Sequence, residues 1–210
     1  MIYLTVKKIP DGENAVGLYQ KALALYAPSQ NNAQYVEKLS MRADGSAKES
    51  LFALILLSTL VERAGRSVKG LELCRNANGK PYFENSDLKF SISHSGGYVA
   101  VALSDDGDIG IDIETADVSE EKARKLAKRF FTEDEQCAVR DDTDAFLKLW
   151  SKKEATAKYL GTSLTQIIQN DRSDQADAVY NEMKFQTVTA NDVAVTVCAG
   201  CGASTDVTVF

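Results

Sequence analysis

Hydrophobic and polar residues change their spacing several times along the chain, and each spacing predicts a structural element. Alternation at every second position predicts strands, and apolar residues recurring every three or four positions predict helices. The most apolar segment, 51–61, lies inside a predicted helix over 48–64 that Gly65 ends. The other predicted elements are strands over 2–9, 71–74, 88–93, 98–104, 109–114, 179–189, 193–199 and 207–210, helices over 13–26, 119–131, 133–140 and 144–160, and a short helix within 29–46.

The order of these elements predicts the fold class. Asn78-Gly79 and Asp106-Gly107 are typical hairpin turns and predict that the strands beside them pair. A strand, then helices, then strands occur in the first half, and the same order returns from residue 98 onward. We therefore expect an α+β protein of two similar lobes, an N-terminal lobe over 1–104 and a C-terminal lobe over 105–210.

Composition and charge disfavour three classes of protein: generic nucleic-acid binders, membrane-spanning proteins and disulfide-rich secreted domains. The chain has 210 residues, 44% hydrophobic, and a formal net charge of −6, which disfavours generic nucleic-acid binding. Segment 51–61 is too short to cross a membrane, and the amino terminus does not resemble a signal peptide. The four cysteines form no dense framework, so we expect reduced thiols and a cytoplasmic location.

The strand over 109–114 carries the first candidate chemistry. Its alternation places three isoleucines on one face and Gly110, Asp112 and Glu114 on the other. Two carboxylates about 7 Å apart along a strand can converge on one hard cation, and Mg²⁺ prefers oxygen ligands. The same alternation is also typical of a half-buried strand with a solvated polar face.

A second pattern lies in the helix over 144–160. Trp150, Glu154 and Lys158 recur every fourth residue and therefore share one helix face. Glu154 could supply a third carboxylate to a metal, and Lys158 could reach a phosphate. The alternative is a surface ion pair between Glu154 and Lys158, which contributes little to stability.

The chain has one histidine, His94, between small hydroxyl-bearing and glycine residues. A single histidine excludes a three-histidine zinc site and the paired-histidine zincin helix. A Ser-His-Asp triad is formally possible, but the chain has no nucleophile-elbow pattern. The surroundings of His94 suit contact with a phosphate, and the alternative is a turn histidine bonded to nearby backbone.

Taken in order, these segments resemble the 4′-phosphopantetheinyl transferase superfamily, in its larger, surfactin-synthetase-activating type. The resemblance extends over 78–161. The segments that carry it are Asn78-Gly79-Lys80-Pro81-Tyr82, Ser93-His94-Ser95, Gly110-Ile111-Asp112-Ile113-Glu114, Phe130-Phe131 with Glu135, and Trp150-Ser151-Lys152-Lys153-Glu154-Ala155 with Lys158.

The resemblance implies a pseudo-twofold monomer with its active site between two α/β lobes. It implies that Asp112, Glu114 and Glu154 bind Mg²⁺, with Mn²⁺ as an alternative, and that coenzyme A is the co-substrate. A carrier-protein serine would attack the diphosphate of coenzyme A, and adenosine 3′,5′-bisphosphate would leave. The residues implied to contact coenzyme A are His94 and Ser93 at its phosphates, Lys158 at the pantetheine-side phosphate, and Lys80 near the adenosine end.

Glu135 is the proton acceptor that the resemblance implies for the attacking serine. The sequence Thr132-Glu133-Asp134-Glu135 is also a capping box, in which Glu135 would bond back to the helix start. A purely structural role for Glu135 therefore stays open.

Two departures from the family pattern concern the ligand channel. Gly161-Thr162-Ser163 stands where the family often has a second glycine, and Glu49 stands where an arginine is common. Lys38, Arg42 and Lys48 are the candidates for the 3′-phosphate, with an ordinary solvated surface as the alternative.

The helix over 119–131 predicts a docking surface. An acidic carrier protein would be attracted to its five cations, although lysine and arginine are also ordinary helix formers. These cations are Lys122, Arg124, Lys125, Lys128 and Arg129.

Three rival interpretations stay open. One is a coenzyme A-binding protein that has lost turnover, a second is a Mg²⁺-dependent phosphohydrolase that uses the same carboxylates, and a third is a plain interaction module. Cys198 and Cys201 form a lone C-x-x-C without a second ligand pair, which favours a late strand and turn over a metal or redox site.

Overall fold

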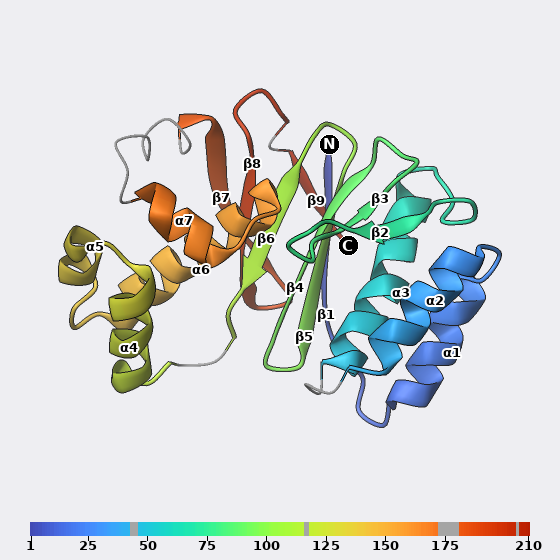
Figure 1. Ribbon diagram of the computed structural model, residues 1–210, viewed down its shortest axis with the longest axis horizontal. Helices are drawn as coiled ribbons and strands as arrows, with labels where there is room; N and C mark the ends of the chain where they lie inside the picture. Colours follow the sequence, from blue (N-terminus) through green and yellow to red (C-terminus); the bar gives the residue numbers. More distant parts are fainter. Residues whose placement is uncertain (43–45, 116–117, 172–180, 205) are drawn as a thin grey trace.

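The computed structural model describes residues 1–42, 46–115, 118–171, 181–204 and 206–210. Helices and strands come in separate runs along the chain, the order that is typical of an α+β protein (Figure 1). In chain order the elements are β1 (Ile2–Lys8), α1 (Ala15–Tyr26), α2 (Gln30–Ser40), α3 (Ala47–Arg63), β2 (Leu73–Arg75), β3 (Pro81–Phe83), β4 (Lys89–Ser95), β5 (Tyr98–Ser104), β6 (Ile109–Ile113), α4 (Glu120–Phe130), α5 (Glu133–Ala138), α6 (Thr143–Leu160), α7 (Leu164–Asp171), β7 (Met183–Ala190), β8 (Val193–Gly200) and β9 (Val207–Val209).

Among the described residues the strands form three sheets, with the orders β4-β5-β1-β9, β6-β8-β7 and β2-β3. All neighbouring strands run antiparallel except β9, which runs parallel to β1. The last strand of the chain therefore lies beside the first one. The mixed composition confirms the α+β prediction, while the division into lobes at residues 104 and 105 stays a prediction.

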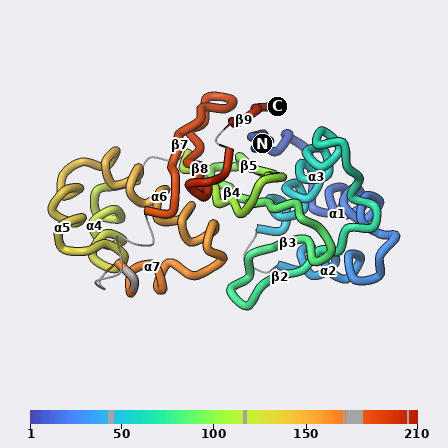
Figure 2. The backbone as a smooth tube through the Cα atoms, turned by 90° about the horizontal axis from the view of Figure 1, so that it is seen from above, coloured from blue at the N-terminus to red at the C-terminus, as the bar shows by residue number. Residues whose placement is uncertain are grey.

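The two larger sheets pack against each other through apolar side chains. Alternate residues of β1 and β5 meet the isoleucines of β6 and the valines of β8 in one buried cluster. Figures 1 and 2 show α1, α2 and α3 on one side of the paired sheets and α4, α5, α6 and α7 on the other. The order of layers is thus helices, sheet, sheet and helices (Figures 1 and 2).

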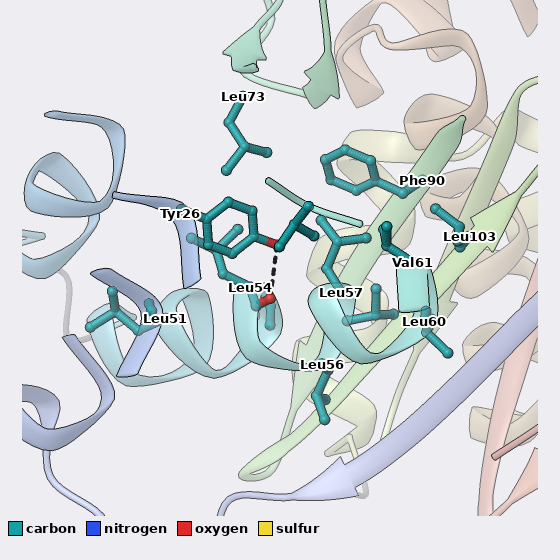
Figure 3. Packing of buried hydrophobic residues seen from close by; sticks show 14 of the residues in the cluster. Tyr26, Leu51, Leu54, Leu56, Leu57, Leu60, Val61, Leu73, Phe90 and Leu103 are labelled. Carbon is teal, nitrogen blue, oxygen red and sulfur yellow. Dashed lines mark hydrogen bonds between the residues drawn. The ribbon is translucent and has the colours of Figure 1, made fainter. Parts of the chain in front are cut away.

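Helix α3 forms the centre of the first helical layer. Leu51, Leu54 and Leu57 are buried against β5 and the neighbouring helices (Figure 3). The Tyr26 hydroxyl donates to the carbonyl of Leu54 at 3.0 Å and so joins α1 to α3. The prediction of a buried helix over 48–64 is confirmed, and Gly65 follows it with a left-handed φ of 72°.

The structure corrects one predicted strand connection and adds one helix that the sequence did not predict. The prediction that Asp106-Gly107 forms a hairpin is wrong, because β5 and β6 on either side of it belong to different sheets. Helix α7 has no counterpart in the sequence prediction, and residues 179–180 of the strand predicted over 179–189 lie outside the described residues. None of the described helices has the length and hydropathy needed to span a membrane.

Candidate active site

The polar face of β6 lies directly against helix α6. A Cβ atom on Gly110 would stand 2.0 Å from the carbonyl oxygen of Ala155 and 2.4 Å from the backbone nitrogen of Tyr159, so only glycine permits this approach. The polar face is therefore buried rather than solvated, and Asp112 is only 4% exposed. The predicted alternation of β6 is confirmed, and α6 is the element that approaches Gly110.

Three donors satisfy the buried carboxylate of Asp112. The Ser151 hydroxyl donates to Oδ2 at 2.9 Å. The Ser93 hydroxyl donates to Oδ1 at 2.9 Å, and the Lys158 ammonium donates to the same oxygen at 2.7 Å. Because the ammonium lies so close, the buried negative charge has a direct counter-ion.

Glu114 and Glu154 complete an acidic cluster around Asp112. Glu114 accepts hydrogen bonds from Ser95 at 3.2 Å and from the indole of Trp150 at 3.0 Å. Burial raises the pKa of Glu114, and the Asp112 carboxylate raises it further. Burial also raises the pKa of Glu154, with Lys158 acting to lower it and the other two acids acting to raise it.

The chemistry of this donor set fits a hard divalent cation. Three carboxylates supply oxygen ligands, and one lysine leaves their combined charge only partly compensated. Within the described residues, no three side chains of ligand type stand close enough to form a finished metal site. In the present arrangement Asp112 binds Lys158, so a cation at Asp112 would require that ammonium to move.

His94 does not share a face with the acidic cluster. It pairs with Val99 in the β4–β5 ladder, and Val99 packs in the cluster around α3. Ser93 and Ser95 occupy the opposite face of β4 and contact Asp112 and Glu114. His94 is exposed at its position, and its predicted contact with a phosphate stays a prediction.

Lys80 lies at the other end of β6 from Glu114. Its ammonium donates to the carbonyl oxygens of Ile109 at 3.2 Å and Tyr159 at 3.1 Å, and burial lowers its pKa. The amides of Asn76 and Asn78 donate to the carbonyl of Gly161 at 2.8 and 2.9 Å.

These donors satisfy carbonyl groups at the C-terminal end of α6, which Gly161 closes with a left-handed φ of 64°. The loop over 76–80 therefore fixes α6. The predicted contact of Lys80 with the adenosine end stays a prediction.

Glu135 has two structural partners. Its carboxylate accepts the backbone N–H of Thr132 at 2.8 Å, which completes the capping box of α5. It also forms an ion pair of 2.9 Å with the buried Lys153, which binds Asp171 as well. The capping box is confirmed, and the role of Glu135 as a proton acceptor stays a prediction.

The basic residues proposed for the 3′-phosphate fall into two groups. Lys38 and Arg42 line a cavity of about 430 Å³ together with Arg75 and Tyr35. Lys48 is exposed in the first turn of α3. The cavity thus gathers three cations around one aromatic ring, which is a suitable surface for an anionic group.

The five cations of α4 are exposed, as a docking surface requires. Arg124 and Lys125 pair with Glu120 and Glu121 of the same helix, at 2.6 Å in each case. A cavity of about 460 Å³ lies between α4, α5 and the start of α6. The two ion pairs leave Lys122, Lys128 and Arg129 as the cations that no acid offsets in the described part of the chain.

Sequence reasoning missed three donors to the acidic cluster. The donors are Ser95, in the segment Ser93-His94-Ser95, and Trp150 and Ser151, at the start of the segment over 150–155. Their donation to the acids was not predicted from the sequence. The alternation of serines in 91–95 and the position of Trp150 on the face of Glu154 are the signals that could have identified two of them.

Comparisons with known proteins find two family models that match this chain. One family model, described as 4′-phosphopantetheinyl transferase superfamily, matches residues 108–198. A second, described as 4′-phosphopantetheinyl transferase, N-terminal, matches residues 19–106. The first match contains all three acids and Lys158, and the second contains His94 and Lys80.

Individual relatives carry the same name. The chain is 35% identical to 4′-phosphopantetheinyl transferase AcpT of Salmonella typhi over 106 residues, which cover 48% of this chain and 55% of the relative. It is 34% identical to the 4′-phosphopantetheinyl transferase of Bacillus subtilis over 126 residues, with 57% and 54% covered. It is 33% identical to 4′-phosphopantetheinyl transferase gsp of Aneurinibacillus migulanus over 123 residues, with 55% and 50% covered.

The matched stretch spans about half the length of these relatives. The two family models, however, adjoin each other and together match most of the sequence from residue 19 to residue 198. With the acidic cluster and Lys158 inside the matched region, we conclude that the chain belongs to the 4′-phosphopantetheinyl transferase superfamily.

Proposed function

We propose that this chain transfers the 4′-phosphopantetheine group of coenzyme A to a serine of an apo acyl or peptidyl carrier protein. The serine oxygen bonds to the pantetheine-side phosphorus, the bond from that phosphorus to the bridging oxygen breaks, and adenosine 3′,5′-bisphosphate leaves. The observation that carries the proposal is the gathering of Asp112, Glu114 and Glu154 with Lys158 in a chain of this superfamily.

The three acids would hold Mg²⁺, or Mn²⁺ in its place. A divalent cation held there would neutralise charge on the diphosphate oxygens and favour the leaving group. Lys158 would leave Asp112 and bind the pantetheine-side phosphate, where its charge stabilises the negative charge that develops. The positions of β6 and α6, fixed at Gly110, would orient these groups before the substrate arrives.

The cationic cavity of Lys38, Arg42 and Arg75 supports a site for the 3′-phosphate of coenzyme A, with Lys48 as a further candidate. We predict that His94 contacts the phosphates of coenzyme A and that Lys80 lies near its adenosine end. We predict that Glu135 is the proton acceptor for the attacking serine. A Glu135→Gln variant retains an acceptor for the capping box but loses the ion pair with Lys153. A loss of transfer in a variant that circular dichroism shows to be folded would support the base, and near-normal transfer would remove it.

The carrier protein would dock on α4 and its neighbouring cavity. An acidic carrier is attracted to the exposed cations. The residues that line the cavity beside them include the apolar Ala123 and Phe146. We predict a monomer that works in the cytoplasm.

Mass spectrometry of apo carrier proteins tests the proposal. After incubation with coenzyme A and Mg²⁺, we expect a gain of one phosphopantetheine on a carrier serine and the release of adenosine 3′,5′-bisphosphate. We expect Asp112→Ala and Glu154→Gln to lower the rate by at least about 100-fold, while the surface variant Asp87→Asn keeps it.

Two results would contradict the transferase proposal. Release of phosphopantetheine without a carrier would indicate a phosphohydrolase. Coenzyme A binding without any transfer, across fatty-acid, polyketide and nonribosomal-peptide carriers, would indicate a silent binding protein.

A further inference from the structure

Three serines of β4 connect the two main sheets. They occupy alternate positions and face β6, which belongs to the other sheet. Each hydroxyl accepts the backbone N–H of a residue on β6 or directly after it. The bonds are Ile111 N–H to Ser91 at 3.0 Å, Ile113 N–H to Ser93 at 3.3 Å and Thr115 N–H to Ser95 at 3.3 Å.

This serine ladder, Ser91, Ser93 and Ser95, takes the place of a backbone ladder between two strand edges. Strand β6 pairs with β8 on one side only, so its other edge needs partners for its buried N–H groups. The serines supply these partners and hold β4 and β6 at a fixed register. Their period of two matches the period of the acids on β6.

Ser93 uses its full hydrogen-bonding capacity at this position. Its oxygen accepts from Ile113 N–H and from the Lys158 ammonium at 2.9 Å, and its hydrogen is donated to Asp112 at 2.9 Å. A hydroxyl has two lone pairs and one hydrogen, so no donor is left for a phosphate. These three bonds occupy the Ser93 hydroxyl, and its predicted place at the coenzyme A phosphates stays a prediction.

Ser95 repeats the pattern one step along the ladder. It accepts from Thr115 N–H and donates to one oxygen of Glu114, while Trp150 donates to the other oxygen. Ser91 accepts from Ile111 N–H at 3.0 Å, and the residue that precedes Ile111 is Gly110, whereas Asp112 precedes Ile113 and Glu114 precedes Thr115. Ser91 thus has the ladder bond without a carboxylate partner among the described residues.

We propose that Ser93 and Ser95 are positioning residues that orient Asp112 and Glu114 for a divalent cation. The proposal rests on the metal site of the proposed function. The hydroxyl hydrogens fix the direction in which each carboxylate presents its remaining lone pairs. Outer partners of this kind commonly change metal affinity by about 10-fold to 100-fold when they are removed.

The test is a titration of the full-length protein with Mn²⁺, with free Mn²⁺ measured by electron paramagnetic resonance. We expect Ser93→Ala and Ser95→Ala to raise the Kd for Mn²⁺ by about 10-fold or more. Ser91→Ala is the matched control, because it loses the same type of bond to β6 without touching a carboxylate. Thermal unfolding of all three variants separates loss of the fold from loss of orientation.

The outcomes separate this inference from the proposed function. If the wild type binds Mn²⁺ and all three variants bind it equally well, the positioning role is overturned while the metal site stands. If affinity falls equally in all three, the ladder acts only through the fold, and the inference is also overturned. If the wild type binds no Mn²⁺ but transfers phosphopantetheine, the metal site and the inference fail together.

Discussion

At the scale of single residues, Asp112 shows how the protein keeps a charge in its interior. The carboxylate is buried, yet three side chains from two different elements donate to it. Removing any one donor would leave part of a buried charge without compensation, which is more costly than losing an exposed bond. The donors Ser93, Ser151 and Lys158 are therefore as necessary to the site as the acid that they stabilise.

Cys198 and Cys201 differ strongly in environment despite their close spacing. Burial raises the pKa of the Cys198 thiol from 9.0 to about 12, whereas Cys201 is exposed and donates to the carbonyl of Asn181. Both thiols are free, so the C-x-x-C segment forms no disulfide in this structure.

We expect iodoacetamide at pH 8 to modify Cys201 and the exposed Cys137 and to leave Cys198 unmodified until the protein unfolds. The reactivity of Cys198 in the folded protein should stay low as the pH rises and increase only toward pH 12, because the thiolate is the reactive form. The unfolded thiol ionises at lower pH, so this group lowers the free energy of unfolding as the pH rises above about 9. Peptide mapping checks the result, and equal labelling of Cys198 and Cys201 would contradict it.

At this scale the sequence predicted the acids and Lys158 but not most of their partners. The acids follow from alternation and helical spacing, which are local patterns. Ser151 and Ser95 become donors only because β4, β6 and α6 meet in space, and no local pattern encodes that meeting. Glu135 shows the converse, since its local capping role was predictable and its ion pair with Lys153 was not.

At the scale of elements, the site depends on the close packing of α6 on β6. Gly110 permits this contact, and α6 then brings Trp150, Ser151 and Lys158 to the carboxylates of β6 and the residue after it. The loop over 76–80 fixes the far end of α6. The glycine therefore acts on the chemistry through the placement of a helix.

A Gly110→Ala variant tests this dependence. The added methyl group must displace the backbone of α6, so we expect the free energy of unfolding to fall by about 1–3 kcal/mol and phosphopantetheine transfer to fall with it. Urea denaturation measures the first quantity. Gly202→Ala is the control, because no atom lies within 4 Å of the added group. Equal stability of the two variants would show that the contact is not tight.

The buried ion pairs of Lys153 join α6 to α5 and α7. Lys153 is 1% exposed and binds the carboxylates of Glu135 and Asp171. We expect Lys153→Met to lower the free energy of unfolding by about 3 kcal/mol, because it leaves the acids without a counter-ion.

The exposed Lys148 of the same helix provides the control, and Lys148→Met should change the free energy of unfolding by less than about 0.5 kcal/mol. Combining Lys153→Met with Asp171→Asn should recover part of the loss. Chemical denaturation that finds Lys153→Met as stable as Lys148→Met would contradict this account.

Sequence patterns predicted the type of most elements and failed on how two of them connect. The helices over 48–64 and 144–160 have strong periodicity and lie where the pattern placed them. Asp106-Gly107 does form a tight bend, with φ of 112° at Gly107, but the bend leads from one sheet to the other. A turn signal fixes local backbone geometry and does not specify which strands will pair.

At the scale of the whole molecule, an acidic protein carries a basic helix on its surface. The net charge is −6, while α4 presents five exposed cations. Long-range attraction would favour an acidic partner at this helix and disfavour it elsewhere. The prediction of five docking cations on this helix did not include the two ion pairs within α4.

Charge reversal at α4 tests the docking surface. We expect Lys122→Glu with Lys128→Glu to raise the KM for an acidic carrier by at least about threefold at low salt. The effect should shrink at high salt, because the screening length falls to about 8 Å at 0.15 M. The matched control is Lys69→Glu with Lys184→Glu, which changes the net charge equally at exposed positions outside α4. Equal KM values for the two double variants would place docking on another surface.

The proposed metal site requires Asp112, Glu114 and Glu154 to surround one divalent cation. Anomalous diffraction from crystals of the protein grown with Mn²⁺ would locate that cation. We predict one peak within about 2.0–2.5 Å of oxygens from the three acids, with the Lys158 ammonium moved away from Asp112. No peak at saturating Mn²⁺, or a peak on another surface while Lys158 stays bound to Asp112, would contradict the account.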